Sequence, residues 1–115
     1  MRTNFKMEDT YITMVKGDTL AFGVEFEDQS GNPIDIDTAF FTCKKNYNDD
    51  SNTFQKSLGN GITRADVGQY RVKVAPSDTI SKEAGKYFYD FQVSKNGDVF
   101  TFMRGVLELE QDVTI

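Results

Sequence analysis

Alternation of hydrophobic and polar residues is the clearest pattern in this chain, and it predicts β-strands. Residues 19–27 place a large hydrophobic side chain at every second position, and residues 69–75 and 86–95 repeat the pattern. A period of two residues is typical of a strand that buries one face. These three segments supply the predicted core, which consists of Leu20, Phe22, Val24, Phe26, Tyr70, Val72, Val74, Tyr87, Tyr89, Phe91 and Val93.

A β-hairpin is predicted near the end of the chain, with residues 86–95 and 98–110 as its strands. The two segments flank Asn96 and Gly97. Asn-Gly is the strongest short-range hairpin signal, because both residues tolerate the positive φ of a type I′ turn. This hairpin is the element around which we expect the rest of the fold to be organised.

The second strand of that hairpin contains a change of phase. Phe100 and Phe102 lie on even positions, whereas Leu107 and Leu109 lie on odd ones. These side chains cannot all lie on one face of an unbroken strand. We therefore predict a β-bulge at Gly105, which would insert one residue and restore the inward face.

Further strands are predicted in the remaining chain, together with at most one short helix. Residues 10–15 and 38–45 are strand-like, residues 53–58 could form a short edge strand, and residues 61–63 could touch the sheet briefly. The segment that follows Pro76 resembles a helix start. About seven short strands with one helical turn predict an all-β fold, an antiparallel β-sandwich with a small barrel as the alternative.

Length and composition fit one domain over residues 1–115 with an aromatic core. The chain has 115 residues, ten Phe, five Tyr and no Trp. A chain of this length buries about two-thirds of its unfolded surface, which is enough for an independent core. Aromatic rings must therefore fill much of the interior.

The charge balance and the apolar pattern limit the classes of partner. Thirteen Lys and Arg face eighteen Asp and Glu, which gives a net charge of -5. This surplus of negative charge disfavours nucleic-acid binding, because the backbone phosphates would be repelled. The sequence shows neither a signal peptide nor an apolar run of transmembrane length. We expect no membrane partner and a location in the cytosol, or release from it by lysis.

Catalytic and metal chemistry are disfavoured by the residues that the chain lacks. It has no His and a single Cys, Cys43, which we expect to be a buried hydrophobe in a strand. No phosphate loop, Cys-x-x-Cys pair or nucleophile elbow is present. We expect no enzyme activity, no cofactor, no metal and no small-molecule ligand. Oxygen-rich loops can hold Ca²⁺, but solvated turns are the commoner role of carboxylates such as Asp28, Asp35, Asp37, Asp49 and Asp50.

Surplus hydrophobic residues on the polar sides of strands point to a contact surface. Exposed apolar patches usually mark interfaces, although a loop or a helix could equally cover them. The predicted interface residues are Phe40, Phe88, Phe100, Phe102 and Met103. A carbohydrate-binding or adhesion module is the alternative, in which Tyr11, Tyr47 or Phe88 would stack on sugar rings.

The segment from Glu83 to Tyr89 is similar to the tyrosine-corner region of immunoglobulin-like (Ig-like) domains. In that region a Gly-x-Tyr opens a late strand, and the Tyr hydroxyl binds the backbone a few residues upstream. The matching residues here are Gly85 and Tyr87. Tyr89 stands where an antibody-type domain carries a disulfide Cys, which excludes the disulfide-stapled version. An ordinary aromatic strand face is the alternative.

Turns and strand starts along nearly the whole chain resemble small Ig-like β-sandwich domains of phages and prophages. The nearest group is the N-terminal domain of baseplate upper proteins, with related head and tail decoration modules. The resemblance implies a non-catalytic virion protein that binds other virion proteins and self-associates, located in the virion or, before assembly, in the host cytoplasm. The matching segments are residues 16–19, 28–36, 68–70, 76–79, 85–90 and 112–114.

Overall fold

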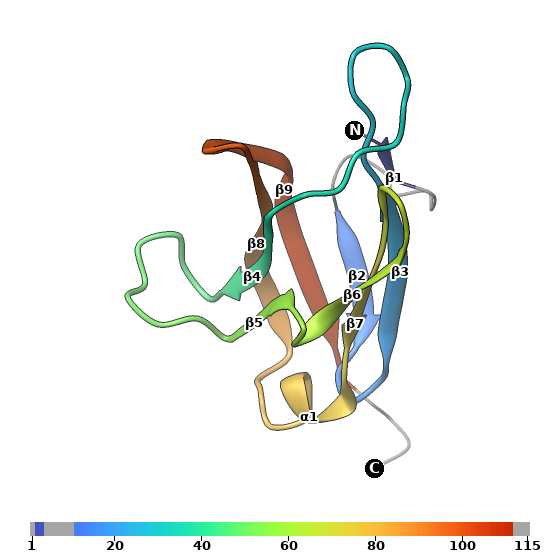
Figure 1. Cartoon of the computed structure of the whole chain (residues 1–115). Coiled ribbons are helices and arrows are strands. Elements are labelled where there is room, and N and C mark those ends of the chain that lie inside the picture. Colours follow the sequence, from blue (N-terminus) through green and yellow to red (C-terminus); the bar gives the residue numbers. More distant parts are fainter. Residues whose placement is uncertain (1, 4–10, 112–115) are drawn as a thin grey trace.

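Within the residues that the structure describes, the fold consists of nine strands and one short helix (Figure 1). The computed structural model describes residues 2–3 and 11–111, apart from the side chains of residues 2, 3 and 102. In chain order the elements are β1 (Arg2–Thr3), β2 (Ile12–Val15), β3 (Leu20–Glu25), β4 (Thr38–Lys44), β5 (Phe54–Leu58), β6 (Gly61–Asp66), β7 (Gln69–Val74), α1 (Pro76–Thr79), β8 (Gly85–Lys95) and β9 (Asp98–Glu110).

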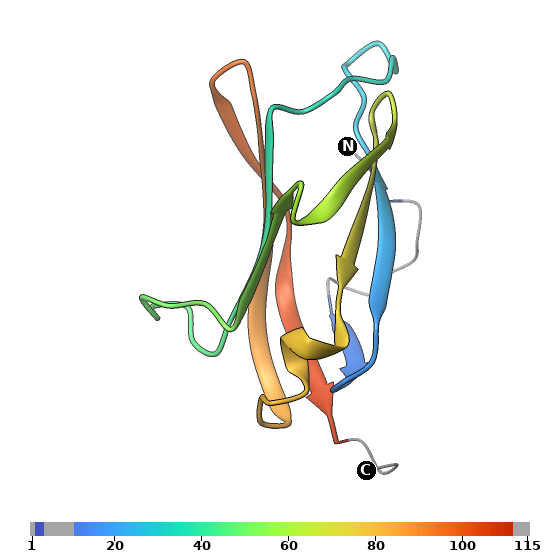
Figure 2. The ribbon, with the colours of Figure 1, turned by 60° about the horizontal axis from the view of Figure 1, so that its bottom comes forward.

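The strands form a single sheet that curls nearly into a barrel. Their order across the sheet is β1-β3-β7-β6-β5-β4-β8-β9-β2. Figure 2 shows β4, β8 and β9 on one side of the interior and β3 and β7 on the other, with β5 and β6 between them. We call these two sides the β4–β8–β9 wall and the β3–β7 wall. The fold is therefore all-β, as the alternation predicts, and its shape approaches the barrel alternative.

The prediction of a purely antiparallel sheet is wrong, because two strand pairs are parallel. β2 runs parallel to β9, with Ile12 opposite Leu107, and β5 runs parallel to β6 over Ser57 and Leu58. Parallel strands are usually far apart along the chain, as β2 and β9 are, whereas only Gly59 and Asn60 separate β5 from β6. Hydrophobic alternation identifies a strand but not its partner, so the sequence pattern could not supply these pairings.

The hairpin of β8 and β9 forms as predicted. Asn96 and Gly97 both have positive φ, at 54° and 85°, as a type I′ turn requires. The bulge, however, is at Phe102 and not at Gly105. Phe91 pairs with Met103 and Gln92 with Thr101, so Phe102 is the extra residue, whereas Gly105 pairs regularly with Tyr89.

The interior is aromatic, with Phe41 at its centre. Its ring centroid lies 5.5 Å from those of Phe22 and Tyr89, and 5.8 Å from that of Phe91. Such edge and tilted contacts are the favoured geometry of aromatic pairs. Ten of the eleven predicted core residues are buried, and the eleventh, Leu20, is half-buried against them.

Tyr87 anchors the start of β8, as the tyrosine-corner pattern predicts. Its hydroxyl donates a hydrogen bond of 2.8 Å to the backbone carbonyl of Glu83, four residues upstream. Just before this segment, α1 forms the predicted single helical turn. Thr79 is fully buried there and accepts a hydrogen bond from the Gly17 N–H at 2.9 Å, which joins the helix to the turn between β2 and β3.

Three chain segments depart from the predicted elements. Residues 53–58 are predicted as a possible edge strand, but β5 pairs with β4 on one side and with β6 on the other. Residues 61–63 were expected to touch the sheet only briefly, but Gly61–Asp66 forms a complete strand, β6, that pairs with β7. β1 was not predicted; it pairs Arg2 with Glu25 of β3. A two-residue strand leaves no periodic signal, since at least four residues are needed to show alternation.

Candidate functional site

A cleft of about 450 Å³ lies on the outward face of the β4–β8–β9 wall. The loop that follows β4 borders it, and Figure 1 shows this green loop extending away from the body of the sheet. The volume falls within the roughly 300–1,000 Å³ that is usual for ligand sites. The residues that line the cleft are Thr42, Lys44, Tyr47, Asp50, Asn52, Gln55, Phe88, Tyr89, Asp90, Thr101 and Arg104.

Strand register places the polar side chains of the cleft in one row. Thr42 of β4 pairs with Gln55 of β5 on one side and with Asp90 of β8 on the other, and Asp90 pairs with Arg104 of β9. Because paired residues point to the same side of a sheet, these four side chains follow one another across the outward face. The Gln55 amide donates to the Thr42 hydroxyl at 3.0 Å.

Tyr47 brings an aromatic ring to the cleft from the loop. Its ring stacks on that of Phe88, with centroids 4.1 Å apart and 27° between the planes, and the Arg104 guanidinium lies 5.8 Å from the Tyr47 centroid. The loop is held by Lys44, which donates to the Asp49 carbonyl at 2.9 Å, and by Asp49, whose carboxylate accepts from the Asn46 N–H at 3.0 Å. The aromatic pair is therefore positioned by the loop and not by the sheet alone.

Two carboxylates, Asp50 and Asp90, line the cleft without a partner among the residues the structure describes. Asp50 is exposed, whereas Asp90 is half-buried, and its side chain makes neither a hydrogen bond nor an ion pair within that part of the chain. A carboxylate that loses water without gaining a partner carries a desolvation cost. Asp90 is thus a free acceptor between Thr42 and Arg104.

The predicted interface residues differ in how exposed they are. Phe40 is 38% and Phe100 45% exposed, whereas Phe88 is half-buried beneath Tyr47. Met103 is only 7% exposed and belongs to the core, so its prediction as an interface residue is wrong. The bulge at Phe102 turns Met103 inward. The side chain of Phe102 lies outside the part that the structure describes.

The three aromatic residues proposed for sugar stacking do not lie together. Tyr47 and Phe88 meet in the cleft, but Tyr11 does not contribute to it. The Tyr11 hydroxyl donates to the Glu108 carboxylate, and this contact raises the pKa of Tyr11 above its usual value. Tyr11 is therefore engaged elsewhere on the surface.

Most of the loop carboxylates hold backbone or side-chain groups of their own neighbourhood. Asp28 accepts from the Ser30 and Asn32 N–H groups at 2.9 Å, and Asp37 accepts from the Asn96 N–H at 2.8 Å. These bonds account for turn geometry. Among the residues that the structure describes, no group of three or more His, Cys, Asp or Glu side chains is placed to hold a metal ion.

Asp35 joins the segment before β4 to the turn between β6 and β7. Its carboxylate accepts from the Gly68 N–H at 2.9 Å and from Arg64 at 3.1 Å. The Gly68 hydrogen bond, followed by the Arg64 interaction, lowers the pKa of Asp35 below its usual value. The Tyr70 hydroxyl donates to Asp35 at 3.3 Å and accepts from the Ile36 N–H at 3.1 Å. This group fastens the loop to the sheet.

Cys43 is fully buried on the inward face of β4, as predicted. Burial raises the pKa of its thiol to about 12. Since the thiolate is the reactive form, Cys43 is chemically inert in the folded chain.

A comparison with protein-family models finds no match, and a comparison with curated proteins finds none either. The interpretation of the cleft therefore rests on the contacts of its own residues. Within the described ranges, none of the helices has the length and hydrophobicity that a membrane crossing requires.

Proposed function

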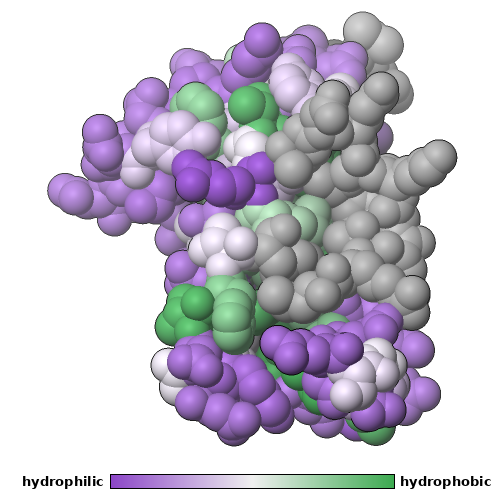
Figure 3. Space-filling model, turned by 90° about the horizontal axis from the view of Figure 1, so that it is seen from above, coloured by the Kyte–Doolittle hydropathy of each residue, from purple (hydrophilic) through white to green (hydrophobic). Residues whose placement is uncertain are grey.

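We propose that this chain is a non-catalytic structural protein of a phage or prophage virion, which docks on other virion subunits and on copies of itself. The observation that carries the proposal is exposed apolar surface at the hairpin end of the β4–β8–β9 wall. On the outward face Phe40 is 38% and Val99 62% exposed, and Phe100, which pairs with the inward-facing Val93, is 45% exposed at the same end. Figure 3 looks down on this end of the molecule and shows hydrophobic patches among hydrophilic side chains. Such surface usually marks a contact site.

The strand order supports an Ig-like version of the fold. Within the single sheet, β1-β3-β7-β6 and β4-β8-β9 are runs of neighbouring strands. When β2 and β5 are left out of the count, these runs are the first, second, fifth and fourth strands and the third, sixth and seventh strands, which are the strands that an Ig-like sandwich places in its two sheets. The Tyr87–Glu83 hydrogen bond adds the tyrosine corner. The phage resemblance of the turns then favours the virion, with the host cytoplasm before assembly, as the location.

Light scattering after size exclusion tests the docking surface, together with co-purification with virion particles. We expect the wild-type chain to self-associate and to be found in particles. Replacing Phe40 and Val99 by Ser should return it to a monomer. Val67→Ser is the matched control, because the exposure of Val67, 47%, lies between those of Phe40 and Val99, but Val67 lies at the turn between β6 and β7. A strictly monomeric wild-type chain that is absent from virion particles would contradict the proposal.

Carbohydrate binding is the second candidate function, and a separate observation favours it. The stacked rings of Tyr47 and Phe88 line the same cleft as the unpartnered Asp90 carboxylate. An aromatic surface beside free hydrogen-bonding groups is what a sugar ring requires. This cleft is distinct from the apolar residues Phe40 and Val99, which are not part of its lining.

A further inference from the structure

We infer that the cleft binds an electrically neutral glycan, whose hydroxyl groups would bridge Asp90 and Arg104 beside the Tyr47 ring. This inference rests on carbohydrate binding as the second candidate function and adds the chemical class of the ligand. It is carried by three features of the cleft: its charges, its unpartnered acceptor and its fixed aromatic pair.

The charges that line the cleft cancel. Lys44 and Arg104 contribute two positive charges, and Asp50 and Asp90 contribute two negative charges. Attraction and repulsion therefore offset each other for any ion, and an anionic or cationic ligand would lose its hydration without a net electrostatic gain. A neutral, strongly hydrogen-bonding ligand avoids this cost.

Asp90 and Arg104 offer complementary hydrogen-bonding groups on adjacent strands. The two residues are directly paired between β8 and β9. A carboxylate only accepts and a guanidinium only donates, whereas a hydroxyl does both. Neighbouring hydroxyl groups of one sugar ring could therefore satisfy Asp90 and Arg104 together. Hydrogen bonds to charged groups are stronger than those between neutral groups. We therefore expect Asp90 and Arg104 to contribute strongly to the affinity for the glycan.

The aromatic pair is fixed before any ligand arrives. Tyr47 remains 55% exposed although it stacks on Phe88. The stack and the Lys44–Asp49 contact restrain the loop, so little ordering entropy remains to be lost on binding. The exposed part of the Tyr47 ring can then pack against the apolar C–H face of a pyranose.

An array that carries neutral, anionic and amino-sugar glycans tests the inference, followed by calorimetric titration with the glycans that bind. We expect saturable binding of neutral glycans. Asp90→Asn and Tyr47→Ala should each weaken it at least about tenfold. Asp98→Asn and Tyr11→Ala are the matched controls, because neither residue lines the cleft, and they should leave binding unchanged. Thermal melting verifies that each variant folds, and Arg104→Gln replaces Asp90→Asn if that variant does not.

The outcomes separate the inference from the function on which it rests. Binding of only anionic or only amino-sugar glycans would overturn the neutral ligand and leave carbohydrate binding intact. Absence of saturable binding to all three classes would overturn both. Neither outcome bears on the docking of Phe40 and Val99, which light scattering measures separately. Neutral binding that survives both Asp90→Asn and Tyr47→Ala would place the site elsewhere and contradict the inference.

Discussion

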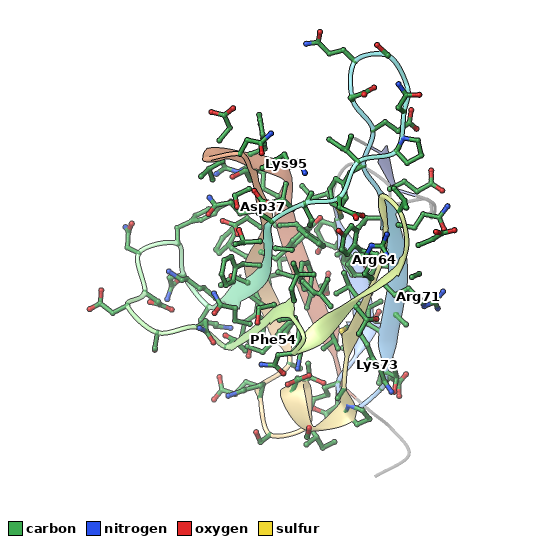
Figure 4. The ribbon with its side chains drawn as sticks, in the orientation of Figure 1. Asp37, Phe54, Arg64, Arg71, Lys73 and Lys95 are labelled. Carbon is green, nitrogen blue, oxygen red and sulfur yellow. The ribbon has the colours of Figure 1, made fainter. Side chains whose placement is uncertain are left out.

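The two walls of the sheet bury the same kind of residue and differ in what they expose. On the inward face, the β3–β7 wall buries Phe22 and Val72, and the β4–β8–β9 wall buries Phe41 and Phe91. Outward, β7 presents the charged side chains Arg71 and Lys73, which Figure 4 labels. The other wall presents aromatic rings and the cleft. Folding therefore explains the inward residues of both walls, and function is to be sought in the outward residues of one.

Chemical labelling of Cys43 should show the largest contrast between inward and outward positions. Its folded pKa is about 12, against about 8.5 for an exposed thiol. At pH 8 the folded chain should react with iodoacetamide about a thousandfold more slowly than the unfolded chain, because far less thiolate is present. Stability that depends on the neutral thiol should fall as the pH rises from about 8.5 toward about 12. Rapid labelling of the native chain would contradict the inward placement.

Truncating neighbouring phenylalanines separates the two faces of β4. Phe41→Ala should lower the free energy of unfolding by about 3–5 kcal/mol, because it empties the centre of the aromatic core. Phe40→Ala, one residue away and exposed, should change it by about 0.5 kcal/mol or less. Urea unfolding measures both. Similar losses for the two variants would show that the inward and outward assignment of β4 is wrong.

Removing the Tyr87 hydroxyl should have a smaller effect. Tyr87→Phe breaks the hydrogen bond to Glu83 and should lower the free energy of unfolding by about 0.5–1.5 kcal/mol. Tyr47→Phe is the control in the outward cleft and should be close to neutral, since the Tyr47 ring and not its hydroxyl makes the contacts. A neutral Tyr87→Phe would mean that the corner does not stabilise the start of β8.

The Asp35 contact should give the smallest effect, visible as pH dependence. Because its folded pKa is lowered, Asp35 contributes stability above its unfolded pKa of about 3.9, and this is lost as the pH falls through the folded pKa. Asp35→Asn should therefore reduce stability at pH 7 and lessen the loss in acid, with Asp98→Asn as a control. Melting temperatures between pH 2 and pH 7 test it; an unaltered pH profile in Asp35→Asn would contradict the role.

Local features of the fold could be predicted from the sequence, whereas contacts between distant segments could not. Alternation predicts the core and most of the strands, though not β1 or the full length of β6, and Asn96–Gly97 predicts the hairpin, because these signals lie within a few residues. The prediction of the bulge at Gly105 is wrong because it relies on the general frequency of glycine at bulges. The position of the bulge at Phe102 follows from the pairing of Met103 with Phe91, which depends on tertiary packing.

The candidate site shows the same limit. The sequence points to Phe88 as an aromatic residue on the polar side of its strand, and the structure places Phe88 in the lining of the cleft. The cleft itself was not predicted, because it requires Tyr47 to stack on Phe88 across 41 residues of chain. The row of Thr42, Asp90 and Arg104 likewise depends on the register of three strands. Sequence alternation gives the face on which each residue lies, but not its neighbours.

The most direct test of the contrast between the walls is amide NMR during titration of the isotope-labelled chain with pooled neutral glycans. We predict that the signals that shift belong to the cleft on the β4–β8–β9 wall, with Phe88, Asp90 and Arg104 at the centre. Signals from Arg71 and Lys73 on the other wall should remain in place. Shifts centred on the β3–β7 wall, or no shifts at saturating glycan, would contradict a binding site on the outward face of β4, β8 and β9.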